Sequence, residues 1–253
     1  MCAYVKSILK HEDLVDVAMK IFSDKIDFVL HSIWMSINVS RGNHFTHQDY
    51  NFTKTGFDVS ALSFHRLMSV LYQRDAMNEW GSIVALSYMA AQRVFPDYND
   101  MADNKAYLES VARSFGYFFG RDKKVRVNTI SQSPTPTTAG SGVKGFDGFI
   151  AYAEKMSPLG NATALECADY TISLFSDLTK KVTLQNLFHD GGFSNRGVNN
   201  AILHNFMKNY KPEPEKIVEE PKMISKTKHF ILKNLEIDAS NITAFFVIFI
   251  IDF

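Results

Sequence analysis

Residues 82–89 read Ser-Ile-Val-Ala-Leu-Ser-Tyr-Met, an apolar run that ends in polar residues. A short run of this kind, bounded by turn signals, is typical of a buried strand. Pro96 and Asp97 then indicate a turn and a helix start, and apolar residues recur at spacings of three and four as far as Phe119. The stretch therefore predicts a strand, a loop and a long amphipathic helix.

Helical and strand patterns alternate on both sides of this stretch. We expect helices at 12–23, 58–76, about 98–119, 146–156 and 164–178, and strands at 26–33, 82–89, 125–131 and 186–190. Alternation of this kind predicts an α/β fold, in which helices cover both faces of a mostly parallel sheet.

Two tyrosines and a lysine, Tyr88, Tyr98 and Lys105, lie where the strand gives way to the helix. If the helix begins near Tyr98, its hydroxyl and the Lys105 ammonium project from one face and can converge. A lysine beside a phenol helps the phenol to act as an acid or an oxyanion partner. The same spacing recurs at Tyr117 and Lys124, where the apolar pattern indicates core or interface packing. The residues alone leave Tyr98 and Lys105 open to a catalytic or a packing role.

Composition agrees with a soluble domain, because 253 residues with 46% hydrophobic content can bury a substantial core. A formal net charge of zero provides no general attraction for nucleic acid, and the basic run 121–126 indicates a helix end. Cys2 and Cys167 give no disulfide framework, and residues 1–10 lack a signal-peptide pattern. We therefore expect a cytoplasmic protein that binds no nucleic acid.

Two further motifs have weaker support. His44, His47 and Asp49 supply three possible metal ligands, but their loop-like setting favours a structural role, so no metal site is expected. Residues 140–145, Gly-Ser-Gly-Val-Lys-Gly, match a dinucleotide-binding pattern without following a strand. Their composition, with that of the Pro/Thr-rich segment before them, favours a mobile lid.

The segments 82–109, 125–131 and 189–194 together resemble the NADH-dependent enoyl-acyl-carrier-protein reductases of bacterial fatty-acid synthesis, within the short-chain dehydrogenase superfamily. The resemblance runs from about residue 12 to about residue 198 and is most specific at 87–105, 131–137 and 190–193. A ketoreductase of the superfamily would have serine where this chain has Ala85. That difference, with the additional Tyr88, favours the enoyl reductase branch.

The resemblance implies a partial Rossmann-like, doubly wound parallel sheet that lacks its first strands. The glycine-rich turn that would hold the cofactor pyrophosphate is expected before residue 12 and would be missing. We expect residues 1–200 to form this partial reductase domain and residues 201–253 to form a C-terminal tail of unknown role. Residues 243–251 are strongly apolar but only about half as long as the ~20 residues a membrane span needs.

Roles for individual residues also follow from the resemblance. Tyr98 would donate a hydrogen bond to the enolate oxygen that forms when hydride reaches a trans-2-enoyl thioester, and Lys105 would bind the nicotinamide ribose. Tyr88 would line the acyl pocket, with apolar walls from Met101 and Phe146, which packing alone would also explain. Lys144 matches a lid cation that could meet the carrier protein. The expected NADH contacts are Ser32, Ile33, Lys105, Pro134, Thr135 and Thr137.

The hypothesis is therefore NADH-dependent reduction of enoyl thioesters carried by acyl carrier protein, in a homo-oligomer like the tetramers of the family. The alternative is a catalytically inactive, truncated remnant that associates through the helices expected at 58–76 and 98–119. One departure bears on this choice, since Trp34 follows Ser32 and Ile33 where the family pattern has glycine. Its ring could fill the nicotinamide pocket or move the end of the strand.

Overall fold

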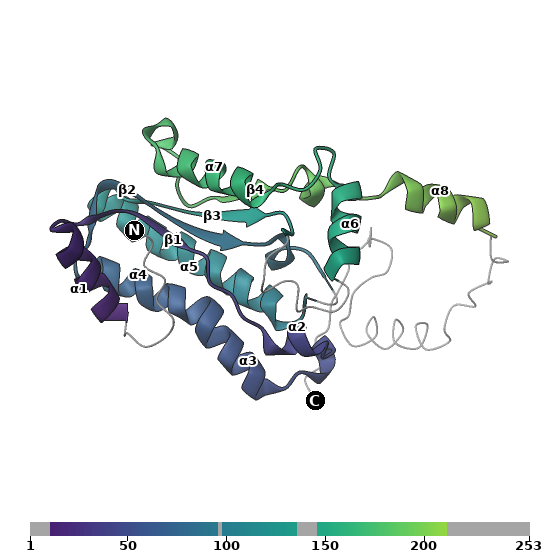
Figure 1. Ribbon diagram of the computed structural model, residues 1–253, viewed down its shortest axis with the longest axis horizontal. Coiled ribbons are helices and arrows are strands. Elements are labelled where there is room, and N and C mark those ends of the chain that lie inside the picture. Colours follow the sequence, from purple (N-terminus) through teal and green to yellow (C-terminus); the bar gives the residue numbers. More distant parts are fainter. Residues whose placement is uncertain (1–10, 96–97, 136–145, 212–253) are drawn as a thin grey trace, which may run out of the picture. The chain divides into compact units, whose positions relative to one another are not determined.

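Four parallel strands form one sheet in the computed structural model, which describes residues 11–95, 98–135 and 146–211 (Figure 1). The strands lie side by side in chain order: β1 (Ile26–His31), β2 (Met77–Ser87), β3 (Arg126–Gln132) and β4 (Asn186–His189). The predicted parallel sheet and its four strands are confirmed. Because every strand pair is parallel, all four carboxyl ends meet at one edge of the sheet.

Helices cover both faces of the sheet, as the alternating pattern predicted. Phe64 and Leu108 pack with Ile83 on one face, whereas Leu174 packs with Val84 on the other. Consecutive residues of β2 therefore point to opposite helical layers. The described helices are α1 (His11–Phe22), α2 (Ile37–Arg41), α3 (Tyr50–Phe57), α4 (Ser63–Gln73), α5 (Asp100–Lys123), α6 (Phe146–Met156), α7 (Ala164–Phe175) and α8 (Asn200–Asn209).

Several predicted boundaries were wrong. The helix expected at 58–76 is the second half of a helical run that begins with α3 and passes through a π-helical turn at Asp58–Leu62 into α4. β1 ends at His31, so Ser32 and Ile33 lie beyond the strand. β2 begins at Met77 and continues through Trp80 although the φ of Trp80 is +68°. α7 ends at Phe175, because Ser176 is extended.

The start of α5 also differs from the prediction, and it matters for the site. Asn99 has a φ of +47°, and its side chain accepts a hydrogen bond from the Asp100 amide, which caps the helix. Tyr98 therefore lies before the helix and not in its first turn. Of the basic run predicted to end the helix, Arg121 and Lys123 do lie in the last turn of α5. The prediction was wrong for Arg126, which is buried in β3.

Gly116 allows α5 to approach the sheet closely. A Cβ atom there would lie 2.7 Å from Leu184 Cδ2 and 3.2 Å from Val127 Cβ. One turn later, Gly120 faces more open space, because its nearest contact would be the Val125 carbonyl at 3.8 Å. The two glycines share a helix but differ in what a methyl group would meet.

Arg126 joins β3 to the end of α7 from a buried position. One guanidinium nitrogen donates to the Leu174 carbonyl at 2.7 Å and the other to the Phe175 carbonyl at 3.1 Å. The first nitrogen also donates to the Thr179 hydroxyl at 3.0 Å. The arginine thereby satisfies carbonyls that the helix end leaves without intrahelical partners.

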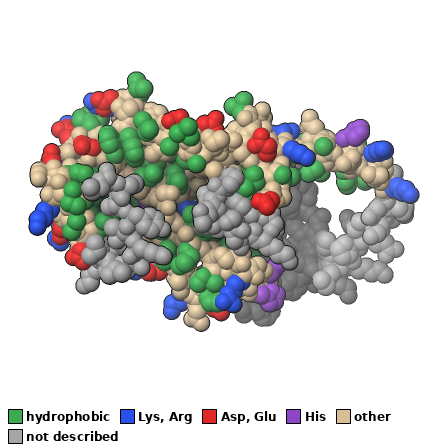
Figure 2. All heavy atoms as spheres, viewed as in Figure 1, with side chains coloured by type: hydrophobic (Ala, Val, Ile, Leu, Met, Phe, Trp, Pro, Cys, Tyr) green, Lys and Arg blue, Asp and Glu red, His purple; other side chains and the backbone are tan. Residues whose placement is uncertain are grey.

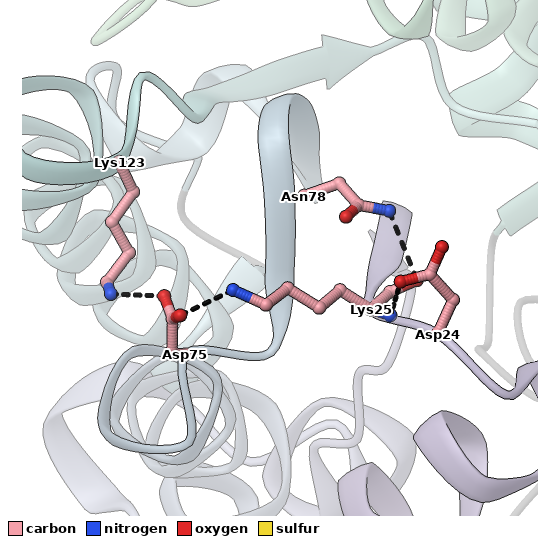
Figure 3. A network of polar contacts seen from close by, with 5 residues as sticks. All are labelled: Asp24, Lys25, Asp75, Asn78 and Lys123. Carbon is pink, nitrogen blue, oxygen red and sulfur yellow. Dashed lines mark hydrogen bonds and ion pairs between the residues drawn. The ribbon is translucent and has the colours of Figure 1, made fainter.

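A polar network ties the ends of three elements together at the opposite edge of the sheet (Figure 3). Asp75, just after α4, accepts hydrogen bonds from Lys123 at the end of α5 and from Lys25 just before β1. These hydrogen bonds, led by that of Lys123, lower the pKa of Asp75 to about 2. Asn78 Nδ2 adds a hydrogen bond to the Lys25 carbonyl at 3.3 Å.

The chain divides into two compact units, residues 1–203 and 204–253, and the site described below lies in the first. Acidic and basic side chains are interspersed on the face of this unit in view in Figure 2. Within the described ranges, no helix has both the length and the apolar character that crossing a bilayer requires. The division at residue 200 between a reductase domain and a C-terminal tail stays a prediction.

The two glycines of α5 provide a test of this packing. Gly120→Ala should stabilise the protein by up to about 1 kcal/mol, because alanine favours the helix. The free energy of unfolding of Gly116→Ala should be about 1 to 3 kcal/mol lower than that of Gly120→Ala, because the added methyl group overpacks against Leu184 and Val127. Urea unfolding of both variants measures the difference, and equal stabilities would contradict the close approach of α5.

Candidate active site

The predicted site residues gather where the parallel strands end, which is where open α/β sheets bind ligands. Tyr88 follows β2 directly, and Ser32 and Ile33 follow β1. Ser133 follows β3 closely, and Asp190 comes directly after β4. The topology thus brings residues far apart in the sequence to one edge of the sheet.

Tyr88 and Tyr98 form a contacting pair. Their ring centroids lie 4.9 Å apart with an interplanar angle of 47°, and the Tyr88 side chain is buried. Burial raises the pKa of both phenols, and Tyr98 and Asp190 add to the rise at Tyr88. Both hydroxyls are therefore neutral at physiological pH and can donate hydrogen bonds.

Lys105 lies in the second turn of α5 and is only 5% exposed. Its Nζ donates a hydrogen bond to the Leu86 carbonyl, 2.7 Å away and two residues before Tyr88. Burial lowers the pKa of Lys105 to about 8, while the charge of Glu109 opposes this shift. At neutral pH the side chain is mostly an ammonium ion, with two further N–H donors beyond the one that Leu86 accepts.

An aromatic cluster surrounds the tyrosine pair. Phe95 lies 5.6 Å from Tyr88 between ring centroids and 5.8 Å from Phe149 of α6, and Phe193 lies 6.2 Å from Phe95. These three phenylalanines were not predicted as site residues. The only signals in the sequence were the position of Phe95 before Pro96 and that of Phe193 in the Asp-Gly-Gly-Phe motif. The cluster provides an apolar wall beside the hydroxyls.

Three buried hydroxyl groups at this edge have no hydrogen-bond partner within the described residues. They belong to Tyr88, to Ser131 near the end of β3, and to Ser194 in the loop after β4. Buried polar atoms in native proteins are almost always paired, and exceptions often mark functional sites. These three hydroxyl groups are therefore available to a ligand.

A second polar cluster fixes the loop after β1 against the start of α5. The two carboxylate oxygens of Asp100 accept hydrogen bonds from Ser36 Oγ at 2.5 Å and from Asn38 Nδ2 at 2.9 Å. Asn99, the helix cap, donates to the carbonyl of Asn43. This cluster, which the sequence did not reveal, holds the segment that follows Ser32 and Ile33 next to Tyr98.

The remaining predicted ligand contacts have varied surroundings. Ser32 and Ile33 are exposed, and Trp34 is partly buried between β1 and α2. The Thr135 hydroxyl is within hydrogen-bonding distance of the Ser133 and Ala162 carbonyls, at 3.1 and 3.3 Å. Met101 and Pro134 are buried. Thr137 and the glycine pattern at 140–145, which includes Lys144, lie outside the described residues. Phe146 begins α6, but its side chain is not among those described.

The competing motifs do not form a site. Tyr117 is 50% exposed, which excludes core packing and leaves interface packing as the prediction. Its hydroxyl accepts a hydrogen bond from Arg121, and Lys124 binds Glu79. His44 and His47 both hydrogen-bond Thr46. In the described part of the chain, no three His, Cys, Asp or Glu residues group closely enough to hold a metal ion.

Comparison with known proteins identifies the family. Residues 4–194 match the family model described as enoyl-(acyl carrier protein) reductase. The chain is 34% identical to the NADH-dependent enoyl-acyl-carrier-protein reductase 1 of Rhizobium meliloti, over 74% of this chain and 71% of that protein. It is 33% identical to the Escherichia coli FabI reductase over 60% of this chain and 58% of that protein.

Solved structures agree with this assignment. The crystal structure of the FabI–NADH complex from Alistipes finegoldii is similar with a TM-score of 0.73 and 55% identity, over 83% of this chain and 74% of that one. The enoyl reductase of Aquifex aeolicus matches with a TM-score of 0.68 and 28% identity, over 74% of this chain and 72% of that one. This chain therefore belongs to the FabI-type, NADH-dependent enoyl-acyl-carrier-protein reductases, as its sequence motifs predicted.

Proposed function

We propose that this chain reduces trans-2-enoyl-acyl-carrier-protein thioesters with NADH, in the elongation cycle of fatty-acid synthesis. The observation that carries the proposal is the neutral Tyr88–Tyr98 pair beside the buried Lys105 ammonium, at the carboxyl ends of the strands. The 55% identity to a FabI–NADH complex supports NADH as the cofactor.

The proposed chemistry uses the two phenols as hydrogen-bond donors. When bound, NADH supplies the hydride that is added to the β-carbon of the enoyl thioester. The electron pair of the double bond then moves toward the thioester oxygen, and the Tyr98 hydroxyl stabilises the resulting enolate by donating to that oxygen. Tyr88 has a buried hydroxyl without an internal partner among the described residues, so it can donate to the same thioester. The reaction is completed when the enolate takes up a proton from solvent at its α-carbon, which gives the saturated thioester and leaves NAD⁺.

The described residues fit the nicotinamide half of NADH better than its pyrophosphate. Lys105 has N–H donors to offer to the ribose hydroxyls, and the strand-end residues Ser32, Ile33, Pro134 and Thr135 are the proposed further contacts. The turn after β1 contains no glycine, and Gly191 after β4 packs against the backbone of Gly160. No described strand end therefore offers a glycine-rich cradle for phosphate.

Acyl carrier protein that bears the enoyl thioester is the proposed partner, and the cytoplasm is the proposed location. A homo-oligomer is also proposed, because α5 exposes Tyr117 and Phe118 by 50% and 52%. We assign residues 1–200 to the reductase domain, with Met101 and Phe146 near the acyl chain and Thr137 near the cofactor.

Tyr98→Phe tests the catalytic role. Turnover of a crotonyl thioester, followed by NADH absorbance in the full chain, should fall by about 10²-fold or more, the scale of losing one oxyanion donor. Tyr117→Phe is the matched control, since it removes a hydroxyl from the other Tyr-x6-Lys pair. Unchanged turnover in Tyr98→Phe would exclude that tyrosine, and an inactive parent chain would favour the remnant alternative.

Tyr88→Phe tests whether the buried Tyr88 hydroxyl has a hydrogen-bond partner inside the protein. Because its buried hydroxyl has no partner in the described structure, removing it should leave stability unchanged or raise it by about 1 kcal/mol. Tyr107→Phe should instead cost about 1 kcal/mol, since that hydroxyl lies 2.6 Å from His65 Nδ1. Urea unfolding compares the two, and equal losses would show that Tyr88 has an internal partner.

Trp34→Gly tests whether the indole obstructs the nicotinamide pocket. If it does, the dissociation constant for NADH should fall without a lower melting temperature. Trp80→Gly is the control, because Trp80 lies near the amino end of β2, away from the carboxyl ends that form the site. Its ring packs beside Lys180 and Lys181. A lower melting temperature with unimproved affinity would mean that Trp34 packs against the protein.

A further inference from the structure

Glu109 is a buried carboxylate that the proposed reaction does not use. Its side chain is 3% exposed and lies one helical turn after Lys105 on α5. Ser87 Oγ donates to Glu109 Oε1 at 2.6 Å, and Gln92 Nε2 donates to Oε2 at 2.9 Å. Each carboxylate oxygen thus has a partner. A charge in such surroundings is costly unless it is paired in this way.

The two partners of Glu109 flank Tyr88. Ser87 is the last residue of β2, and Gln92 directly follows the short 3-10 helix Met89–Ala91. The carboxylate therefore ties both ends of the segment 88–91 to α5. Because only the cap residue Asn99 separates Tyr98 from the start of α5, the same tie helps to fix the two tyrosines relative to one another.

Glu109 also acts on the charge of Lys105. Residues four apart on a helix share a face, and a carboxylate in that position favours the protonated amine. Burial and the Glu109 charge are the two influences on the Lys105 ammonium, and they act in opposite directions. The other titratable groups at the described strand ends are the neutral phenols Tyr88 and Tyr98, the histidines that end β1 and β4, His31 and His189, and Asp190, which binds the amides of Gly192 and Ser194.

We propose that Glu109 is a positioning residue of the reductase site, which anchors the Tyr88 segment to α5 and keeps Lys105 in its ammonium form. This inference rests on the proposed function for its biological meaning. It predicts two physical effects of Glu109, one on the position of the Tyr88 segment and one on the protonation of Lys105. Both effects can be measured without NADH or thioester.

The charge is tested by titrating Lys105 in the full chain, with lysine labelled with ¹³C at Cε and its signal assigned through Lys105→Met. The wild-type signal should titrate near pH 8. In Glu109→Gln it should titrate about one pH unit or more lower, a tenfold loss of proton affinity. Glu79→Gln removes a surface carboxylate that binds Lys124 and should leave the Lys105 signal unchanged.

The tether is tested separately with Ser87→Ala, which removes one hydrogen bond and keeps the carboxylate. Amides of residues 88–92 should exchange with deuterium about fivefold faster, the scale of one lost hydrogen bond, while Lys105 titrates as in the wild type. Glu109→Asp is a second test of the tether, and it keeps the proposal testable if Glu109→Gln does not fold. The shorter side chain keeps the charge near Lys105 and should speed the same exchange.

Two results would overturn the proposal. A Lys105 titration that moves less than about twofold in Glu109→Gln would remove the role of the charge. Unchanged exchange of residues 88–92 in both Ser87→Ala and Glu109→Asp would remove the tether. An inactive chain that nevertheless shows both shifts would refute only the proposed function.

Discussion

The buried ammonium group of Lys105 constrains how the long helix α5 meets the central strand β2. An ammonium ion without partners would cost several kcal/mol inside a protein. The Leu86 carbonyl and the nearby Glu109 carboxylate offset that cost in this arrangement. A shift of α5 along β2 would separate the charge from both partners. The positions of Tyr88, two residues after Leu86, and of Tyr98, just before α5, depend on the same contact.

Contacts elsewhere along α5 also hold the helix in the position that the Lys105 contact requires. Gly116 lets α5 lie against Val127 and Leu184 along the sheet, and the network around Asp75 holds the far end of the helix. The Asp100 cluster holds its near end against the loop after β1. Lys105 and the start of the proposed site thus belong to a helix that is anchored at both ends, as expected for side chains that must keep a defined geometry.

Much of this arrangement could be predicted from the sequence, because local patterns determine it. The apolar run at 82–89 and the three-four spacing up to Phe119 gave the strand and the helix, and family motifs indicated Tyr88, Tyr98 and Lys105. The start of α5 could not be predicted, because the positive φ of Asn99 departs from local preference. Glu109, Ser36 and Phe149 were missed for another reason. Their roles depend on contacts between distant segments, and no local pattern records those contacts.

The arginine at the start of β3 has a consequence for how the protein opens. Its guanidinium binds carbonyl groups 48 to 53 residues later in the chain, at the end of α7 and in the turn that follows. Neither β3 nor the end of α7 can separate without leaving a buried guanidinium unpaired. Fluctuations of the native state should therefore release β3 and the C-terminal turn of α7 together, as one cooperative unit. An opening of β3 alone, or of the end of α7 alone, should therefore be rare. Arg126 would in this way slow the local unfolding of β3, whose other end contributes to the proposed site, without contacting that site.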